Sequence, residues 1–194
     1  VKKKEVFRVE AASLFHELAN NLNLKGLNGV ELYNVYDIYH ADENDIQLLK
    51  TSVLSEIVTD EVFDEIDLTN EQYVAYECLP GQYDQRSDSA QQCLMLLNNK
   101  QDVVIKSGRI VVLKGNVQDE ELQAVKKYLI NPVEMREKDL SVLIYEEDVE
   151  IEPVPVLSGF CEMDDSALSE LMKQHGLAMT LADLKHIQNY FKNE

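Results

Sequence analysis

The chain has 194 residues, of which 45% are hydrophobic, so it is long enough to bury the core of one large domain or two small ones. Its 36 acidic and 18 basic residues give a formal net charge of −18. A phosphate backbone or an anionic lipid surface would repel such a chain, and we expect neither nucleic acid nor membrane as a partner. Three cysteines without C-x-x-C spacing favour a cytoplasmic protein over a disulfide framework or a zinc site.

The first part of the chain predicts the order helix, strand, helix. Apolar residues recur at helical spacing from Val9 to Leu22, and Gly26 and Gly29 follow as stop signals. Residues 30–39 are rich in β-branched and aromatic side chains on both alternations, which is typical of a strand with both faces partly covered. A second helix is expected over residues 42–54, whereas the acidic stretch 57–68 gives no clear pattern.

The second part predicts a strand over Tyr73–Leu79 that stops at Pro80-Gly81, with a helix opening a few residues later. Asp84 or Ser87 would cap this helix, and its apolar face would hold Ala90, Cys93, Leu94 and Leu97. Two short β-rich runs, 103–105 and 110–113, flank Ser107-Gly108 and predict a hairpin. A further helix is expected over residues 118–129, ending before Pro132.

An internal echo links these two parts. Residues 46–57 and 122–133 match at an offset of 76, with apolar residues opposite apolar residues and identities at Gln47/Gln123 and Lys50/Lys126. Each of the two helices follows a strand, which in turn follows a helix. The pattern therefore indicates a duplicated α/β unit over about residues 1–68 and 69–138.

The composition changes after Asp139. The acidic, proline-broken run 146–155 predicts an extended connector, and it lacks the glycine and ligand spacing of a calcium loop. Two helices are expected beyond it. The first would begin near Asp164 and Asp165; the second would be capped by Thr180 and Asp183 and would bury Leu181, Leu184, Ile187 and Phe191.

Three segments of the chain resemble one known family in the same order and spacing. They are Leu79–Cys93 (LPGQYDQRSDSAQQC), Val125–Val133 (VKKYLINPV) and His175–Lys192 (HGLAMTLADLKHIQNYFK). The first is similar to the strand–PGQ–helix signature in the N-terminal domain of the large, single-chain phosphoribosylformylglycinamidine synthases. The second resembles a helix end of the same domain, and the third resembles a helix of the family's linker domain.

This resemblance implies an α+β fold in two domains. Residues 1–138 would be similar to a fused dimer of the small purine-synthase subunit, a duplicated α/β sandwich whose antiparallel sheet is covered by helices with a pseudo-two-fold axis. Residues 139–194 would form a small helical linker domain. Family chains also begin with a strand ahead of the first helix, and only residues 1–7 could supply it here.

The resemblance also implies a function for the whole polypeptide. The family carries out an ATP- and glutamine-dependent amidation of formylglycinamide ribonucleotide in purine biosynthesis, with ATP and magnesium bound by synthase domains that come later in the chain. The partners implied for this portion are the synthase and glutaminase domains of the same ligase. We expect this portion to scaffold ammonia transfer between them, to bind no cofactor and to be inactive alone.

The turn between Pro80 and Arg86 could form an anion cradle, because a helix N-terminus offers free N–H groups. It has one glycine, however, and Asp84 and Asp88 would repel a phosphate, so an inter-domain docking loop is favoured. Arg86 opposes the helix dipole and is expected to pair with Asp88 or with a carboxylate across a domain boundary. The candidate docking residues are Pro80, Gly81, Gln82, Asp84, Gln85 and Arg86.

No catalytic, cofactor-binding or metal-binding residue is predicted. Glu10, His16 and Glu17 share a helix without the H-E-x-x-H spacing of a zinc site, and Cys93 has no neighbouring histidine and is expected on a buried face. Two other functions stay open: an autonomous module that senses a small metabolite at the repeat interface, and an interaction adaptor that uses its acidic surface. A reading frame that continues beyond Glu194 into a catalytic region would favour the ligase.

Overall fold

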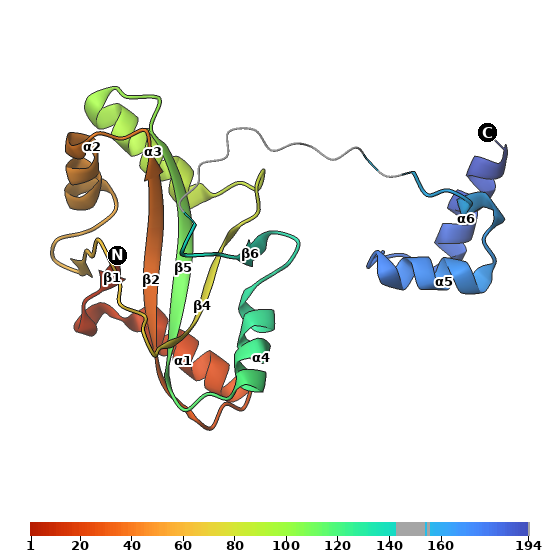
Figure 1. Cartoon of the computed structure of the whole chain (residues 1–194), viewed down its shortest axis with the longest axis horizontal. Coiled ribbons are helices and arrows are strands. Elements are labelled where there is room, and N and C mark those ends of the chain that lie inside the picture. The colour runs from red at the N-terminus through yellow and green to blue at the C-terminus, as the bar shows by residue number, and fades with distance from the viewer. Residues whose placement is uncertain (143–153, 155, 194) are drawn as a thin grey trace. The chain divides into compact units, whose positions relative to one another are not determined.

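A computed structural model describes residues 1–142, 154 and 156–193 (Figure 1). These residues form six α-helices and two antiparallel sheets, an α+β fold. The chain divides into two compact units, Val1–Tyr145 and Glu146–Glu194, which are described separately. The acidic connector predicted over residues 146–155 lies almost wholly outside the described residues.

The helices form where apolar spacing and caps predict them. In the first unit they are α1 (Val9–Asn21), α2 (Glu43–Leu48), α3 (Gln85–Asn98) and α4 (Asp119–Leu129). Helix α2 opens with a capping box between Asp42 and Asp45 and continues as a π-helical turn, η2 (Leu49–Val53). A short 3-10 turn, η1 (Glu5–Phe7), precedes α1.

The main sheet has four antiparallel strands in the order β2-β5-β4-β6. Its strands are β2 (Leu27–Tyr39), β4 (Gln72–Cys78), β5 (Val104–Gly115) and β6 (Met135–Glu137). A two-residue pair, β1 (Lys2–Lys3) and β3 (Asp60–Glu61), forms the second sheet. Ahead of β1, Val1 and Asn34 exchange backbone hydrogen bonds of 2.8 Å, which ties the N-terminus to β2.

The hairpin predicted at Ser107-Gly108 is wrong, because β5 runs through this dipeptide as one central strand. Gly108 pairs with Val35 on one side and with Glu77 on the other. A serine–glycine pair is a turn signal only where the chain must reverse. Here the glycine serves close packing instead, since a Cβ at this position would lie 2.9 Å from Cδ of Lys138.

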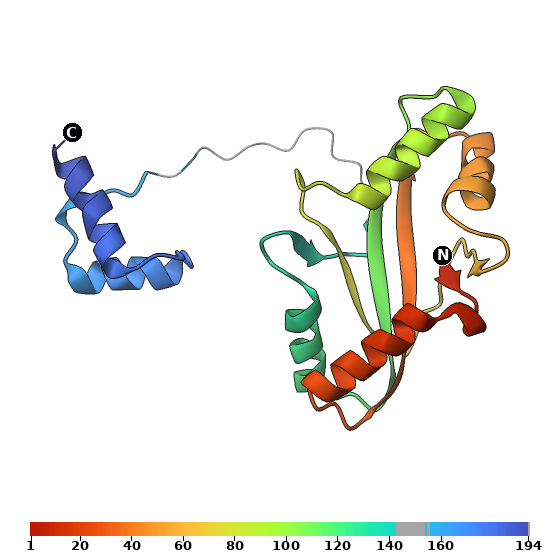
Figure 2. The same ribbon diagram turned by 180° about the vertical axis from the view of Figure 1, so that it is seen from behind.

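Helices cover one face of the main sheet in two groups. Helices α1 and α4 pack Leu18 and Val125 against Val111, whereas α3 and η2 pack Leu94 and Leu49 near Ile105. Figure 2 shows α1 and α3 crossing the sheet toward opposite ends of its strands. Burying each of these aliphatic side chains stabilises the fold by about 1.5–3 kcal/mol. The two groups form separate clusters on the same face of the sheet.

Among the residues that the structure describes, connecting segments rather than helices cover the opposite face of the main sheet. Tyr33, Ile110 and Val112 are buried there against Ile66, Leu68 and Leu140, which belong to connecting segments. The acidic stretch 57–68, which gave no clear sequence pattern, therefore helps to cover the sheet through Ile66 and Leu68.

The second unit is a pair of helices, α5 (Asp165–Gln174) and α6 (Leu181–Asn193), preceded by a 3-10 turn, η3 (Phe160–Glu162). Leu168, Leu171 and Leu184 form its core. Phe191 is not buried as expected: it is 57% exposed and meets Phe160 edge-on at 6.5 Å between ring centroids. The predicted cap is confirmed, since Asp183 accepts hydrogen bonds from the backbone and the hydroxyl of Thr180.

None of the helices that the structure describes combines the length and the apolar character needed to cross a bilayer.

Candidate functional site

The loop after β4 is a tight turn that presents its side chains to solvent. The amide of Gln82 donates to the carbonyl of Leu79 at 3.0 Å, and Gly81 has φ of +85°, which favours glycine. Pro80, Gly81 and Gln82 are exposed. The Gln82 side chain donates only a long contact of 3.4 Å, to the carbonyl of Val133, so its amide is largely available to solvent or to a partner.

Asp84 anchors this loop to both α3 and β5. Its carboxylate accepts hydrogen bonds from the amide of Ser87 at 3.1 Å, and from the amide and hydroxyl of Ser107 at 3.1 and 3.0 Å. Burial alone would raise the pKa of Asp84, but hydrogen bonds from Ser87 and Ser107 outweigh burial and hold that pKa below its ordinary value. The cap predicted for α3 is therefore Asp84, and it also fixes the start of α3 against the middle of the sheet.

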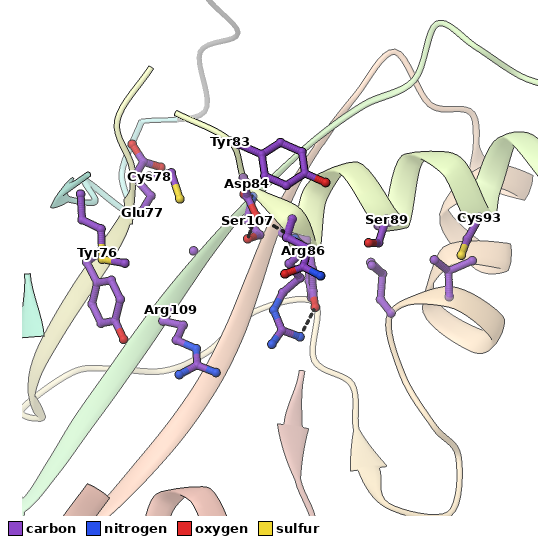
Figure 3. A pocket seen from close by; sticks show the side chains of 17 residues that line it. Tyr76, Glu77, Cys78, Tyr83, Asp84, Arg86, Ser89, Cys93, Ser107 and Arg109 are labelled. Atoms are coloured by element: carbon purple, nitrogen blue, oxygen red, sulfur yellow. Dashed lines mark hydrogen bonds between the residues drawn. The ribbon is translucent and has the colours of Figure 1, made fainter. Parts of the chain in front are cut away.

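A cavity of about 710 Å³ opens beside this anchor, between α3, η2 and the main sheet (Figure 3). We call it the central pocket. Side chains from six elements line it, among them Tyr36 of β2, Val53 of η2 with Leu54 after it, Tyr76 of β4, Arg86 of α3, Ser107 and Arg109 of β5, and Met135 of β6. Because β2 and η2 belong to the first half of the unit and the others to the second, the central pocket lies at the junction of the two halves.

The floor of the central pocket interrupts the apolar face of the sheet. Along β5, Ile105 and Val111 pack under helices, whereas Ser107 and Arg109 lie between them at the same alternation. Tyr76 holds the corresponding place on β4, after buried Val74. Polar side chains thus occupy the middle of a face that is apolar toward both ends.

The two arginines of the central pocket have different partners. Arg109 forms an ion pair with Glu10 of α1 at 2.7 Å. Burial lowers the pKa of Arg109, but Glu10 and Tyr76 outweigh burial and raise it. The only hydrogen bond that the structure gives the Arg86 side chain is a long one, 3.4 Å, to the hydroxyl of Tyr36 (Figure 3).

Asp88, which the sequence suggested as a local partner of Arg86, pairs with other groups. It accepts hydrogen bonds from the hydroxyl of Tyr83 at 2.9 Å and from the amide of Gln92 at 2.8 Å. The hydrogen bond to Asp88 raises the pKa of Tyr83. Within the described residues, the guanidinium of Arg86 therefore lies near an uncharged hydroxyl and has no carboxylate at salt-bridge distance.

The predicted docking residues fall into two groups. Asp84, Gln85 and Arg86 line the central pocket, whereas Pro80, Gly81 and Gln82 form the exposed turn beside it. Sequence reasoning missed the lining residues Tyr36, Tyr76, Ser107 and Arg109. The available signal is that polar residues interrupt the apolar alternation of β5, but the same residues, Ser107-Gly108, also fit a turn.

The cysteines lie in different surroundings. Cys93 is exposed, which corrects the expectation of a buried face, because α3 turns Ala90 and Leu94 to the core and leaves Cys93 at its edge. Cys78 is half-buried, and burial, followed by the nearby charges of Asp84, Glu134 and Glu77, raises the pKa of its thiol. The part of the chain that the structure describes contains no group of three acidic, histidine or cysteine residues able to hold a metal ion.

A comparison of the chain with models of known protein families gave no match, and a comparison with curated proteins gave none either.

Proposed function

We propose that this chain is the non-catalytic N-terminal portion of a phosphoribosylformylglycinamidine synthase, a cytoplasmic ligase of purine biosynthesis that hydrolyses glutamine. In this role it scaffolds the synthase and glutaminase domains of the same polypeptide so that ammonia passes between them. The proposal rests on the three segments that resemble the family. Leu79–Cys93 covers the turn after β4 and most of α3, Val125–Val133 covers the end of α4, and His175–Lys192 covers α6.

The observation that carries the proposal is the spacing of equivalent elements. Helices α1 and α3 begin at Val9 and Gln85, 76 residues apart, and α2 and α4 begin at Glu43 and Asp119, again 76 residues apart. Strands β2 and β5 begin 77 residues apart, at 27 and 104. The sequence offset of 76 residues thus also separates the starts of both pairs of helices in the first unit.

The pairing of β2 with β5 fits the same duplication. The two strands are antiparallel, and Tyr33 lies opposite Ile110 near the middle of both. A two-fold axis through this pair would exchange residues 77 apart, which is also the distance between the starts of the two strands. These relations support a duplicated α/β sandwich with a pseudo-two-fold axis, as the fused small-subunit dimer of the family requires.

The exposed turn Pro80–Gln82, with Gln85 at the start of α3, is the proposed docking surface for the catalytic domains. Its backbone is held by the Asp84 anchor, so a partner would meet a pre-formed surface at little cost in conformational entropy. Its amide side chains offer donors and acceptors that no fold contact fully uses.

The reading frame beyond Glu194 and an assay of the isolated chain test the proposal together. We expect the frame to continue into a synthase region, and we expect the purified chain to hydrolyse neither glutamine nor ATP. A stop codon directly after Glu194, or turnover that copurifies with the chain through several independent preparations, would contradict the ligase assignment.

One observation favours a second function, a module that senses a small metabolite. The central pocket draws its lining from both halves of the first unit, which is where a duplicated fold offers a shared binding site. A natural stop after Glu194 together with saturable ligand binding would favour this module over the ligase.

A further inference from the structure

We propose that the central pocket binds a small organic monocarboxylate with a flat apolar body, and that Arg86 holds the carboxylate. This site goes beyond the scaffolding role, which requires no ligand. The proposal rests on the charge of the lining, on the volume of the cavity and on the aromatic and polar side chains that line it.

One cation of the central pocket, the exposed Arg86, has no carboxylate partner among the described residues. Of the four arginines in the chain, Arg8, Arg109 and Arg136 form ion pairs with carboxylates at 3.4, 2.7 and 2.8 Å. Arg86 has no such partner among the described residues and lies against the Tyr36 hydroxyl. A planar guanidinium matches a carboxylate through two parallel hydrogen bonds, so one negative charge would complete this site.

The acidic residues of the lining do not supply that charge. The carboxylate of Asp84 accepts hydrogen bonds from Ser87 and Ser107. Glu77 pairs with Arg136 at 2.8 Å and with Lys138 at 2.7 Å. Both acids are already committed to fold contacts, and their remaining field disfavours a doubly charged phosphate more than a carboxylate.

The walls fit a flat apolar body. Three tyrosines, Tyr36, Tyr76 and Tyr83, line the central pocket together with the apolar side chains of Leu54 and Met135. The volume of about 710 Å³ lies within the range of small-molecule sites, roughly 300–1,000 Å³. Apolar and aromatic walls with a few convergent polar groups are the usual composition of such a site.

The polar floor would orient the ligand. Ser107 and Arg109 lie at positions where the same face of β5 is otherwise apolar. Arg109 is held by Glu10 and Tyr76, so it contributes donors at fixed positions without a free charge. Arg86 is then the residue that recognises the anion, and Arg109 helps to position the ligand.

NMR titration of the ¹⁵N-labelled chain tests this site with three probes: indole-3-acetate, its neutral analogue indole-3-ethanol, and inorganic phosphate. We expect indole-3-acetate to shift amides around Ser107, Arg86 and Ser89 with a dissociation constant below about 1 mM. Indole-3-ethanol and phosphate should each bind at least about ten-fold more weakly, because the former lacks the carboxylate and the latter lacks the flat apolar body. Equal binding of the neutral analogue would show an apolar cavity only, and stronger binding of phosphate would show a phosphate site; either result overturns the proposal.

Two variants assign the anion contact. Arg86→Ala should weaken indole-3-acetate about 10- to 100-fold, the loss expected for hydrogen bonds to a charged group, and Arg86→Lys should restore part of it. Lys127→Ala, which removes an exposed cation from α4, is the matched control and should change nothing. Unchanged affinity in Arg86→Ala, or no shifts up to about 10 mM probe in the parent chain, overturns the proposal. Neither result bears on the ligase assignment, because the titration measures no catalysis.

Discussion

Gly108 of β5 lies against the side chain of Lys138, which leaves no room for a larger residue at position 108. A Cβ at position 108 would lie 2.9 Å from Cδ of Lys138 and 3.1 Å from the carbonyl of Tyr76. The Lys138 side chain is 6% exposed, and its ammonium reaches the carboxylates of Asp37 and Glu77. The glycine in the middle of a central strand therefore provides the space through which a lysine reaches two buried acids.

Replacing this glycine should destabilise the protein. Gly108→Ala would push the methyl group into Lys138 and strain its contacts with two carboxylates, which we expect to cost about 1–3 kcal/mol. Urea denaturation measures the change. Gly29→Ala is the matched control on β2, where a Cβ would have only one neighbour, at 3.9 Å, and the change should stay within about 0.5 kcal/mol. Equal losses in the two variants would mean that contact with Lys138 is not the reason for the glycine.

The ionised form of Asp84 should contribute to stability in a pH-dependent way. Its folded pKa lies below the ordinary value of 3.8, so its contribution is complete above that value and is lost as pH falls through the folded pKa. Asp84→Asn keeps a capping side chain but cannot accept all the donors of Ser87 and Ser107. We expect it to cost on the order of 1–3 kcal/mol at about pH 7.

The same variant should approach the stability of the parent chain as pH falls below 3.8 and through the lowered pKa of Asp84. Urea midpoints measured over this pH range show the trend. A difference between the variant and the parent that stays constant with pH would mean that the shape of the side chain matters and its ionisation does not.

The helices were predictable because their signals are local. The cap at Asp84, the stop at Pro80-Gly81 and the Thr180–Asp183 pair act within four residues of the backbone they serve. The α+β class was implied by the resemblance to the synthase family, and the structure confirms it. The offset between Gln47 and Gln123 also anticipated the equal spacing of the helix starts.

The central pocket could not be predicted in the same way. Tyr36, Tyr76, Arg86 and Arg109 are far apart in the chain and meet only through the pairing of β2, β5 and β4. The role of Gly108 depends on Lys138, 30 residues later in the sequence, so the sequence near it looked like a turn. Local patterns specify elements, whereas the site arises from contacts between distant residues.

The two cysteines nearest the central pocket should differ in reactivity. Cys93 is exposed, whereas Cys78 is half-buried and burial raises the pKa of its thiol. Since the thiolate is the reactive form, we expect iodoacetamide at about pH 7.5 to label Cys93 before Cys78. Mass spectrometry of the digested protein follows both sites, and unfolding in urea should remove the difference. Faster labelling of Cys78 in the folded chain would contradict the burial of its side chain.

The proposed docking surface predicts a difference between two assays of the proposed full-length ligase. The double variant Gln82→Ala/Gln85→Ala removes exposed amides of the turn without touching the Asp84 anchor. If these amides hold the catalytic domains, glutamine-dependent synthesis should fall about five-fold, the loss expected from more than about 1 kcal/mol at an interface. Ammonia-dependent synthesis should stay unchanged, because free ammonia needs no route between domains.

Gln92→Ala, an exposed change two turns along α3, is the control for the assay and for the melting temperature. If the double variant changes both activities by the same factor relative to the parent, with an unchanged melting temperature, the turn is not part of the interface and is only a surface loop.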